Sequence, residues 1–583
     1  MKKKLLSLLL VATLVLLTAC GGGDKTDDTQ SGDQTSGSNT QTSNDTNSQG
    51  NSDNTTDSGK SSINWDEHTT YTWWMMATFG DWWSDYNGNP VLNYLQDRYN
   101  VTIKVESPVA GTEADSLSLM MGTGNYTDVF SLAQYSGSIP QLFEEGIILD
   151  IAEWLDYMPN LTNMLETNSD FNKSARDDNG RILTFPVISD ESELTWAGLM
   201  YRHDILETMT GDNVKFPSGK GEPTTLADWE YMLPLMKEYF EMAGYADYAP
   251  LIIPATGIIG FGEIASTFNA PPAFYVRNNV VSHGLYDSGT YDYVSTMRDW
   301  YQKGWIHQDF ASRTDDMFFM PNPQLVFSGG AGVFYGMMMH LGDRMSIPDA
   351  GLMFDVRPIP SPIIEGVSSQ KDMMRRGWDL FGGGISNAIY SGAKNVDKLV
   401  SIIDLMYSDE GALLNTIGLL KEQIPSGYDI MDKMGMADGA FWYDANGNIE
   451  LNPKFQIMGG DVGFTDANGV RFPGYQKYSI TNNLASEEAL NSQRAWGGHD
   501  AVTEVFPLPA SISLTVEEAN IISANNARIT DHYNQHMSMF IMGTLTLNED
   551  TWAEFVEYQR SQGLDENLAI QQAAYGRYLN RGN

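Results

Sequence analysis

The chain contains very little cysteine, since Cys20 is the only one among its 583 residues. A single cysteine excludes any disulfide within the chain. Positive charge is also scarce, because 35 lysines and arginines face 75 aspartates and glutamates, which gives a formal net charge of −40 at pH 7. Such a surface repels nucleic acid and anionic lipid, and no basic run reverses this locally. The composition therefore argues against a nucleic-acid-binding protein.

Long apolar runs are missing after the first 17 residues. The run at 5–17 follows three lysines, as in a secretory signal, and is too short to span a bilayer comfortably. It leads into Leu17-Thr18-Ala19-Cys20, which resembles the lipobox of bacterial lipoproteins, where cleavage exposes the cysteine for diacylglyceryl attachment. The alternative is a buried small side chain that happens to follow a signal. We expect a lipoprotein signal peptide at 1–20, whose removal takes three lysines and lowers the net charge from −40 to −43.

Residues 21–62 contain no apolar side chain larger than glycine, only Gly, Asp, Lys, Thr, Gln, Ser and Asn. Nothing in this segment offsets the entropy of ordering it, so we predict a disordered tether. A flexible coil of this length has a root-mean-square span of roughly 30 to 40 Å. The tether and a lipid anchor at Cys20 would hold the following body at the outer face of the cytoplasmic membrane. We expect the source to be a Gram-positive bacterium.

The sequence also lacks the signatures of the common hydrolases, Gly-x-Ser-x-Gly and His-Glu-x-x-His. The Ser-x-x-Lys match at 391–394 has no Lys-Thr-Gly partner. His532 and His536 lie one helical turn apart but have no third ligand nearby, which favours a solvated helix face over a metal site. Hairpin-like segments at 444–447 and 466–469 lack the Gly and Glu positions of a calcium loop. We expect no metal and no cofactor, although a pair of catalytic carboxylates could be hidden among the many acids.

Strand-like and helix-like patterns alternate in the first part of the body. The predicted strands span 71–76, 101–105 and 128–130, and the predicted helices follow Asn89-Pro90 and span 113–121. This alternation is typical of an α/β lobe built on a largely parallel sheet. The body of roughly 520 residues exceeds one ordinary core, which indicates two or three domains or one large bilobal body.

Several stretches follow one another in an order that is known from one protein family. They are LSLMMGTGNYTDVFSLAQYSG (117–137), NGRILTFPVISD (179–190), WAGLMYRHDILE (196–207), PTTLADWEYMLPLMKEYF (223–240), KLVSIIDLMYSDEGALL (398–414) and the C-terminal segment 540–578. Together they resemble the large extracellular solute-binding lipoproteins of carbohydrate ABC transporters. Thr127 stands where that family usually has proline. The resemblance runs through nearly all of residues 65 to 580.

This resemblance implies an α/β, bilobal, periplasmic-binding-protein-like fold with a ligand cleft between two hinged lobes. The lobes are expected to comprise 63–190 with 375–410, and 191–374 with 411–583. The implied function is a monomeric, non-enzymatic receptor that captures an oligosaccharide and delivers it to the permease subunits of an ABC importer. The rival class is a surface glycoside hydrolase or carbohydrate-adhesion lipoprotein that uses the same aromatic residues as subsites.

Tryptophan is plentiful, with 14 residues, and four of them fall within 73–83. A sugar stacks its C–H face on an indole and offers its hydroxyls to planar polar groups, so sugar sites mix both kinds of side chain. The best candidates follow predicted strands or lobe crossovers, or lie in loops rich in Gly and Asp. The predicted ligand-binding residues are Trp73, Trp74, Trp83, Gln134, Tyr135, Trp196, Arg376, Trp378, Trp442 and Trp496.

Two further expectations concern the remaining tryptophans and the ligand's charge. For Trp83 and its neighbour Trp82, a loop folded back on the lobe is an equal alternative to ligand binding. Helix-like surroundings favour a core position for Trp229, Trp300, Trp305 and Trp552. The negative net charge favours a neutral oligosaccharide over a polyanion, although Arg376 or its neighbour Arg375 could pair with a carboxylate.

Overall fold

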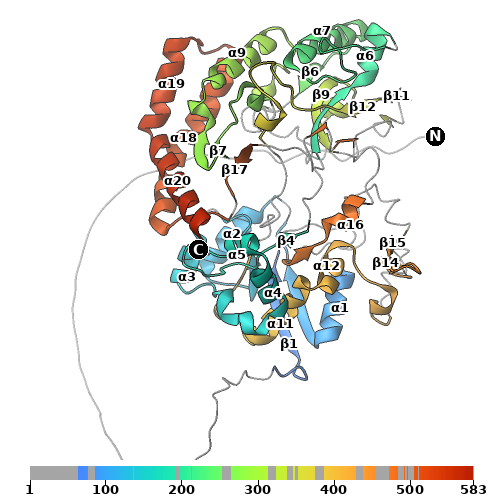
Figure 1. Cartoon of the computed structure of the whole chain (residues 1–583), viewed down its shortest axis with the longest axis vertical. Helices are drawn as coiled ribbons and strands as arrows, with labels where there is room; N and C mark the ends of the chain where they lie inside the picture. The colour runs from blue at the N-terminus through green and yellow to red at the C-terminus, as the bar shows by residue number, and fades with distance from the viewer. Residues whose placement is uncertain are drawn as a thin grey trace, which may run out of the picture. The chain divides into compact units, whose positions relative to one another are not determined.

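Every residue that the computed structural model describes lies in the compact unit Ser62–Asn583, whose helices and strands are drawn in Figure 1. The structure describes residues 63–75, 86–109, 111–135, 137–190, 197–211, 213–252, 264–312, 324–337, 346–347, 352–374, 386–427, 437–452, 472–483, 491–492, 495–496, 504–509 and 511–581. The predicted signal peptide, the lipidation site Cys20 and the tether lie outside these residues. No helix within them combines the length and apolar content that a membrane span requires.

The first lobe is built around a four-stranded sheet of order β13-β3-β1-β2. Its elements are β1 (Thr69–Trp74), α1 (Pro90–Tyr99), β2 (Val101–Glu106), α2 (Glu113–Thr123), β3 (Val129–Ser131), α3 (Ile139–Glu144), α4 (Pro159–Thr167), α5 (Ser169–Ala175), β13 (Asn387–Ile389), α11 (Val396–Asp404) and α12 (Asp409–Thr416). β1 runs parallel to both β2 and β3, whereas β13 runs antiparallel to β3. The predicted alternation of strands and helices is confirmed here.

Local sequence explains how these elements begin and which face they bury. Asn89 accepts a hydrogen bond from the Leu92 amide (3.0 Å) and Pro90 opens α1, as the sequence predicted. In β2 the alternate residues Val101, Ile103 and Val105 are buried. The alternation puts these three side chains on the face of the sheet that forms the first core.

The first core also includes residues from later parts of the chain. Leu414, Leu419 and Phe472 are buried in it together with residues of β1 and α11. Ser408 caps α12 only four residues after α11 ends, so the chain turns back onto the same core. Segments 411–424 and 472–475 therefore contain residues that pack on the first core.

The second lobe is built around a mixed sheet of order β12-β5-β9-β6, with a smaller sheet β17-β7-β8. Its elements are β5 (Ala197–Arg202), α6 (His203–Thr210), α7 (Leu226–Ala243), β6 (Ala249–Ile252), β7 (Phe274–Arg277), β8 (Val280–His283), α9 (Gly289–Gln302), α10 (Gln324–Phe327), β9 (Ala331–Met337), β12 (Val356–Pro358), β17 (Val505–Pro507), α18 (Val516–Met542), α19 (Glu549–Ser561) and α20 (Leu564–Asn580). β5 runs antiparallel to both of its neighbours, and β6 runs parallel to β9.

Tryptophans fill the second core, as the sequence predicted. Trp229 and Trp300 are fully buried and stacked, with ring centroids 6.2 Å apart, and Trp305 lies 6.2 Å from Trp300. Trp552 of α19 packs at the edge of the same core. The helices α18, α19 and α20 lie together in Figure 1, and α18 packs against α9. Aromatic burial of this size is a main source of the lobe's stability.

Two segments that lead out of the first lobe pair with each other through short strands. β4 (Ile188–Ser189) runs parallel to β16 (Tyr475–Gln476), which is followed by α16 (Tyr478–Asn483). The Ile188 amide donates to Gly474 O (3.1 Å) and the Asp190 amide to Gln476 O (3.2 Å). Two further pairs are β10 (Ser346–Ile347) with β11 (Leu352–Met353) and β14 (Phe441–Tyr443) with β15 (Ile449–Leu451).

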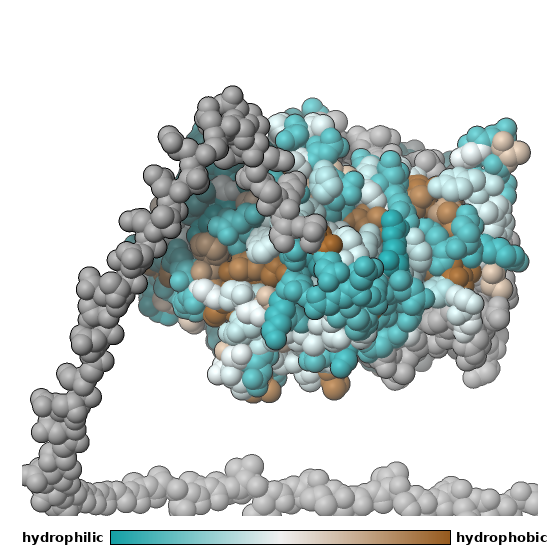
Figure 2. Space-filling model, turned by 90° about the horizontal axis from the view of Figure 1, so that it is seen from below, coloured by the Kyte–Doolittle hydropathy of each residue, from teal (hydrophilic) through white to brown (hydrophobic). Residues whose placement is uncertain are grey.

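The face of the molecule drawn in Figure 2 is mainly hydrophilic, with hydrophobic residues visible in separate areas. This agrees with the excess of acidic residues in the sequence. Charged groups on such a surface keep a protein soluble.

Candidate ligand-binding site

The first-lobe sheet presents one edge at which strands β1 and β3 end. Because β13 is antiparallel to β3, its start at Asn387 lies beside Ser131 at this same edge. The Leu132 amide donates a hydrogen bond to Ser386 O (2.5 Å), which ties the two segments together just beyond the sheet. In α/β sheets, ligands bind outside the carboxyl ends of the parallel strands.

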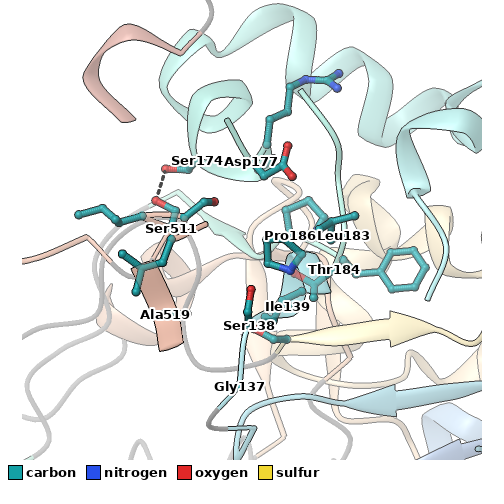
Figure 3. A pocket seen from close by; sticks show the side chains of 18 of the residues that line it. Gly137, Ser138, Ile139, Ser174, Asp177, Leu183, Thr184, Pro186, Ser511 and Ala519 are labelled. Carbon is teal, nitrogen blue, oxygen red and sulfur yellow. Dashed lines mark hydrogen bonds between the residues drawn. The ribbon is translucent and has the colours of Figure 1, made fainter. Parts of the chain in front are cut away.

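A pocket of about 550 Å³ lies beyond this edge, within the size range of ligand sites (Figure 3). One wall consists of first-lobe residues, namely 137–140, 174–177 and 183–187, with Ser386. The other wall consists of residues 511–514 and the first turns of α18 up to Asn526. The pocket is thus shared between the first lobe and the start of the C-terminal helices.

Hydroxyl groups and aliphatic side chains line the pocket. Ser138 Oγ is buried and has no hydrogen-bond partner among the described residues. Ser174 Oγ lies 3.4 Å from Ser511 Oγ across the two walls, as the dashed line in Figure 3 shows. Ile139, Leu183 and other aliphatic residues surround these hydroxyls. A buried hydroxyl without a partner costs free energy, which a ligand group could recover by bonding to it.

The two charged residues that line the pocket already have hydrogen-bond partners. Asp177 accepts hydrogen bonds from the Asn179 and Arg181 amides (2.9 Å each) and pairs with the Arg181 guanidinium (2.6 Å). Arg176 donates through Nε to Asn172 Oδ1 (2.8 Å) and through Nη1 to Gly180 O (2.6 Å). The lining therefore suits an uncharged polar ligand better than an ion.

A group of ion pairs fastens the two walls together. Asp178 pairs with Arg577 Nε (2.6 Å) and with Arg581 Nη2 (2.8 Å) of the C-terminal segment. Arg581 Nη1 also donates to Ser511 O (2.7 Å), beside the pocket. Arg577 pairs with Glu518 (2.6 Å), and although burial opposes it, hydrogen bonding to Arg577 lowers the pKa of Glu518. We call Asp178, Glu518, Arg577 and Arg581 the clamp.

Trp73 and Trp74 lie at the end of β1 but on opposite faces of the sheet. Trp73 is 2 % exposed, donates from Nε1 to Asn387 Oδ1 (3.0 Å) and meets Phe472 edge-on. Trp74 is 4 % exposed and packs with Phe130 in a separate hydrophobic cluster. Successive strand residues point to opposite faces, and both faces are covered here. Their role in ligand binding stays a prediction that this burial does not favour.

Gln134 and Tyr135 follow β3 and lie next to the pocket. Gln134 is exposed and Tyr135 is half-buried. A Cβ on Gly137, which lines the pocket, would approach the Tyr135 ring to 2.5 Å, so glycine allows this ring to fold against the loop. Burial, together with the nearby Glu145 and Tyr126, raises the pKa of Tyr135, so the phenol remains a hydrogen-bond donor.

Trp496 lies at the corresponding edge of the second sheet. β6 and β9 end there, and β5 begins there because it is antiparallel to β9. The indole covers Gly198, where a Cβ would approach the ring to 2.4 Å, and Nε1 donates to Leu199 O (2.7 Å). Trp496 is part-exposed, so a fixed aromatic face lies at the edge where β6 and β9 end, the position at which α/β sheets generally bind ligands.

The other predicted residues are placed elsewhere or lie outside the described residues. Trp442 is half-buried in the β14–β15 hairpin and donates from Nε1 to Glu450 Oε2 (2.7 Å). None of the described predicted residues is among the residues that line the pocket. The remaining candidates, all outside the described residues, are Trp83, Trp196, Arg376 and Trp378.

The hairpin turn at 444–447 and the pair His532 and His536 make contacts that stabilise local structure. In the segment 444–447 Asp444 accepts hydrogen bonds from the Asn446 and Asn448 amides (2.8 Å each), which shapes the hairpin turn. His532 and His536 stack 3.7 Å apart, and His532 Nδ1 lies 2.8 Å from Gln559 Nε2 of α19. These histidines are half-buried against α19, so the expected solvated helix face is only partly correct.

Sequence reasoning missed the serines of the pocket. Ser138 precedes a helix-starting Ile139-Pro140, and Ser511 lies before α18, so both read as loop residues. Serine in a loop carries no motif, and only the fold brings these distant segments together.

No family model matches the chain, and no curated protein matches it. Solved structures do: alginate-binding protein AlgQ2 without calcium ion (17 % identity, 87 % of this chain and 98 % of that chain, TM-score 0.63), an HMO-binding ABC-transporter-associated solute-binding protein from Bifidobacterium longum infantis (19 %, 87 % and 99 %, TM-score 0.66) and the S. pneumoniae ABC-transporter substrate-binding protein FusA in complex with kestose (16 %, 88 % and 99 %, TM-score 0.63). The chain has the bilobal α/β fold of these solute-binding proteins.

Proposed function

We propose that the protein is an extracellular receptor that captures a neutral oligosaccharide and delivers it to the permease of an ABC importer. The observation that carries this proposal is the pocket at the carboxyl edge of the first sheet, lined by hydroxyls and aliphatic groups, whose two charged lining residues already have hydrogen-bond partners. Sugar hydroxyls both donate and accept hydrogen bonds, as serine hydroxyls do. Trp496 adds an aromatic face at the edge of the second sheet.

The structural neighbours support the same proposal. Three of them are an alginate-binding protein, an HMO-binding protein and a protein solved in complex with kestose, and the similarity extends over 98 to 99 % of each of these chains. We propose binding without catalysis for this chain as well. Its expected partners are the oligosaccharide and the permease subunits, and it acts as a monomer.

The binding proposal is tested by a glycan array followed by calorimetric titration of the best ligand at low and high salt. We expect a neutral oligosaccharide whose affinity changes little with salt, because uncharged groups contribute the contacts. A clear preference for uronate-bearing chains, or an affinity that falls steeply as salt rises, would contradict a neutral ligand.

The rival proposal is a glycoside hydrolase. Incubation of the purified protein with the bound oligosaccharide, followed by chromatography, separates the two. We expect the ligand to be recovered intact. Cleavage with turnover would replace the receptor by an enzyme with a carboxylate pair.

Membrane tethering through Cys20 and residues 21–62 is part of the proposal and rests on the sequence alone. Cys20→Ser is expected to move the protein from the membrane pellet to the soluble fraction without changing its melting temperature. Two or three acyl chains are needed for stable anchoring, since one chain binds a membrane only marginally. A mutant protein that stays in the pellet would argue for another anchor.

A further inference from the structure

A histidine and two carboxylates meet at the end of β5 that lies away from Trp496. His203 opens α6 directly after β5 and is 5 % exposed. Its Nε2 lies 3.3 Å from Glu207 Oε1, one helical turn further along, and its Nδ1 lies 3.2 Å from the Tyr201 hydroxyl. The imidazole is thus held in place from both ring nitrogens.

Asp355 completes the group from a distant part of the chain. The His203 amide donates to Asp355 O (2.8 Å), and β12 pairs with β5 from the next residue on. One ligand atom from each of His203, Glu207 and Asp355 lies within 4.8 Å of the other two. Backbone hydrogen bonds therefore fix the position of all three residues relative to one another.

We propose that His203, Glu207 and Asp355 bind a divalent transition-metal ion, with zinc as the test ion. Zinc ligands lie about 2.0 to 2.2 Å from the metal, so neighbouring ligand atoms in a tetrahedral site are roughly 3.4 Å apart. The His203–Glu207 distance of 3.3 Å already meets this requirement. The Glu207 and Asp355 side chains are 42 % and 37 % exposed, which leaves them room to rotate onto the ion.

The residues around His203 determine which metal ion the site would bind. Tyr201 can accept a hydrogen bond from Nδ1–H, which leaves the Nε2 lone pair for the metal, as in many histidine sites. Imidazole is a poor ligand for calcium or magnesium, so the donor set selects a borderline metal. Three protein ligands leave a fourth position for water.

Arg357 is the main competitor of the metal. Its Nη2 lies 2.6 Å from Asp355 Oδ2. A carboxylate has about four lone-pair positions, so Asp355 can hold the guanidinium and a metal together. The positive charge nevertheless opposes a cation, and Arg357→Gln should therefore strengthen metal binding several-fold.

The experiment is calorimetric titration of zinc into the chelator-treated mature chain that carries Cys20→Ser, which also removes its only thiol. We expect one equivalent of zinc, at least a tenfold loss of affinity in His203→Gln, a smaller loss in Glu207→Gln and a gain in Arg357→Gln. The matched control is His532→Gln/His536→Gln, which removes the other histidine pair and should leave the affinity unchanged.

Cobalt absorption provides a second readout, because its visible bands report nitrogen and oxygen coordination. We expect these bands in the parent and the histidine control but not in His203→Gln. If His203→Gln does not fold, Glu207→Gln tests the site instead, because the Glu207 side chain is part-exposed and its substitution disturbs the core less. Absence of zinc binding in the parent, or binding lost only in the His532/His536 variant, would overturn the proposal.

Discussion

The two four-stranded sheets differ in what lies beyond the edges at which their parallel strands end. The first sheet ends in hydroxyl-bearing loops around a pocket, whereas Trp496 covers Gly198 at the edge of the second. The first edge offers donors and acceptors, and the second offers a flat apolar face. A sugar ring presents hydroxyls at its rim and C–H groups on its faces, so the two edges are suited to different parts of one ligand. The two edges are thus complementary rather than equivalent.

The largest effect is expected from a substitution in the clamp, which joins the two walls of the pocket. In Asp178→Ala the guanidinium of Arg581, whose side chain is 5 % exposed, loses its carboxylate partner. We expect a loss of roughly 2 to 3 kcal/mol in the free energy of unfolding, since an uncompensated charge of this kind is costly.

Denaturant unfolding of Asp178→Ala measures this loss, and Asp170→Ala is the control. Asp170 lies on the same helix-loop segment but has only a 4.0 Å contact with Lys173 and a 75 % exposed side chain. If both variants lose the same stability, the clamp does not hold the two pocket walls together.

Acid is expected to weaken the second lobe through His283. Burial lowers the pKa of His283 to about 4, so between pH 6.5 and 4 the imidazole is protonated in the unfolded state but neutral in the folded state. The contribution of His283 to the free energy of unfolding is therefore complete above pH 6.5 and is lost as the pH falls. From pH 7 to pH 5 this amounts to roughly 2 kcal/mol.

Asp287, also in the second lobe, acts in the opposite direction. Burial raises its pKa to about 6, despite hydrogen bonds from Tyr275, so the folded state gains a proton between pH 6 and 4 and is stabilised. His283→Asn keeps an acceptor for the Leu285 amide and removes only the destabilising contribution. Melting curves at pH 7 and pH 5 should show the variant to be less acid-sensitive than the parent. Equal sensitivity would contradict the role of His283.

Gly198→Ala tests the aromatic edge. The added methyl group would displace the Trp496 indole, and we expect a loss of roughly 1 to 3 kcal/mol in stability together with weaker ligand binding. In a Trp496→Ala background the same substitution should cost much less, which a double-mutant cycle measures. Gly221→Ala is the control, because no atom would lie within 4 Å of its Cβ. Additive effects of the two substitutions would contradict the proposed contact.

Ser138→Ala tests the hydroxyl edge and should have the smallest effect. The free energy of unfolding should change little or rise, because a buried hydroxyl without a partner among the described residues is removed. Affinity for the oligosaccharide should fall by roughly 1 kcal/mol if this hydroxyl bonds the ligand. An unchanged affinity would contradict a role of this pocket in binding the oligosaccharide.

The elements that the sequence predicted well depend on local signals. The cap and proline at Asn89 and Pro90 and the alternation at 101–105 fix structure over a few residues. The bilobal fold came from the order of many weak motifs rather than from any single one. Periodicity also indicated buried tryptophans such as Trp300.

What the sequence could not show depends on contacts between distant segments. Trp73 and Trp74 are adjacent in the chain, but two separate hydrophobic clusters cover them, and neither cluster is visible before the sheet is assembled. The pocket likewise needs Ser174 and Ser511 to meet. The sequence does not show the group of His203, Glu207 and Asp355, because Asp355 directly precedes β12 and lies about 150 residues further along the chain than the two residues of α6.

The pairing of β4 with β16 has a mechanical consequence. Two chain segments that leave the first core are hydrogen-bonded to each other, and therefore they form a two-stranded ribbon rather than two independent linkers. A ribbon bends readily across its flat face but resists bending within its plane and resists slippage of one strand past the other. Opening and closing of the lobes would then follow one preferred direction, and a substitution that unpaired the ribbon would make the motion less directed without touching the ligand.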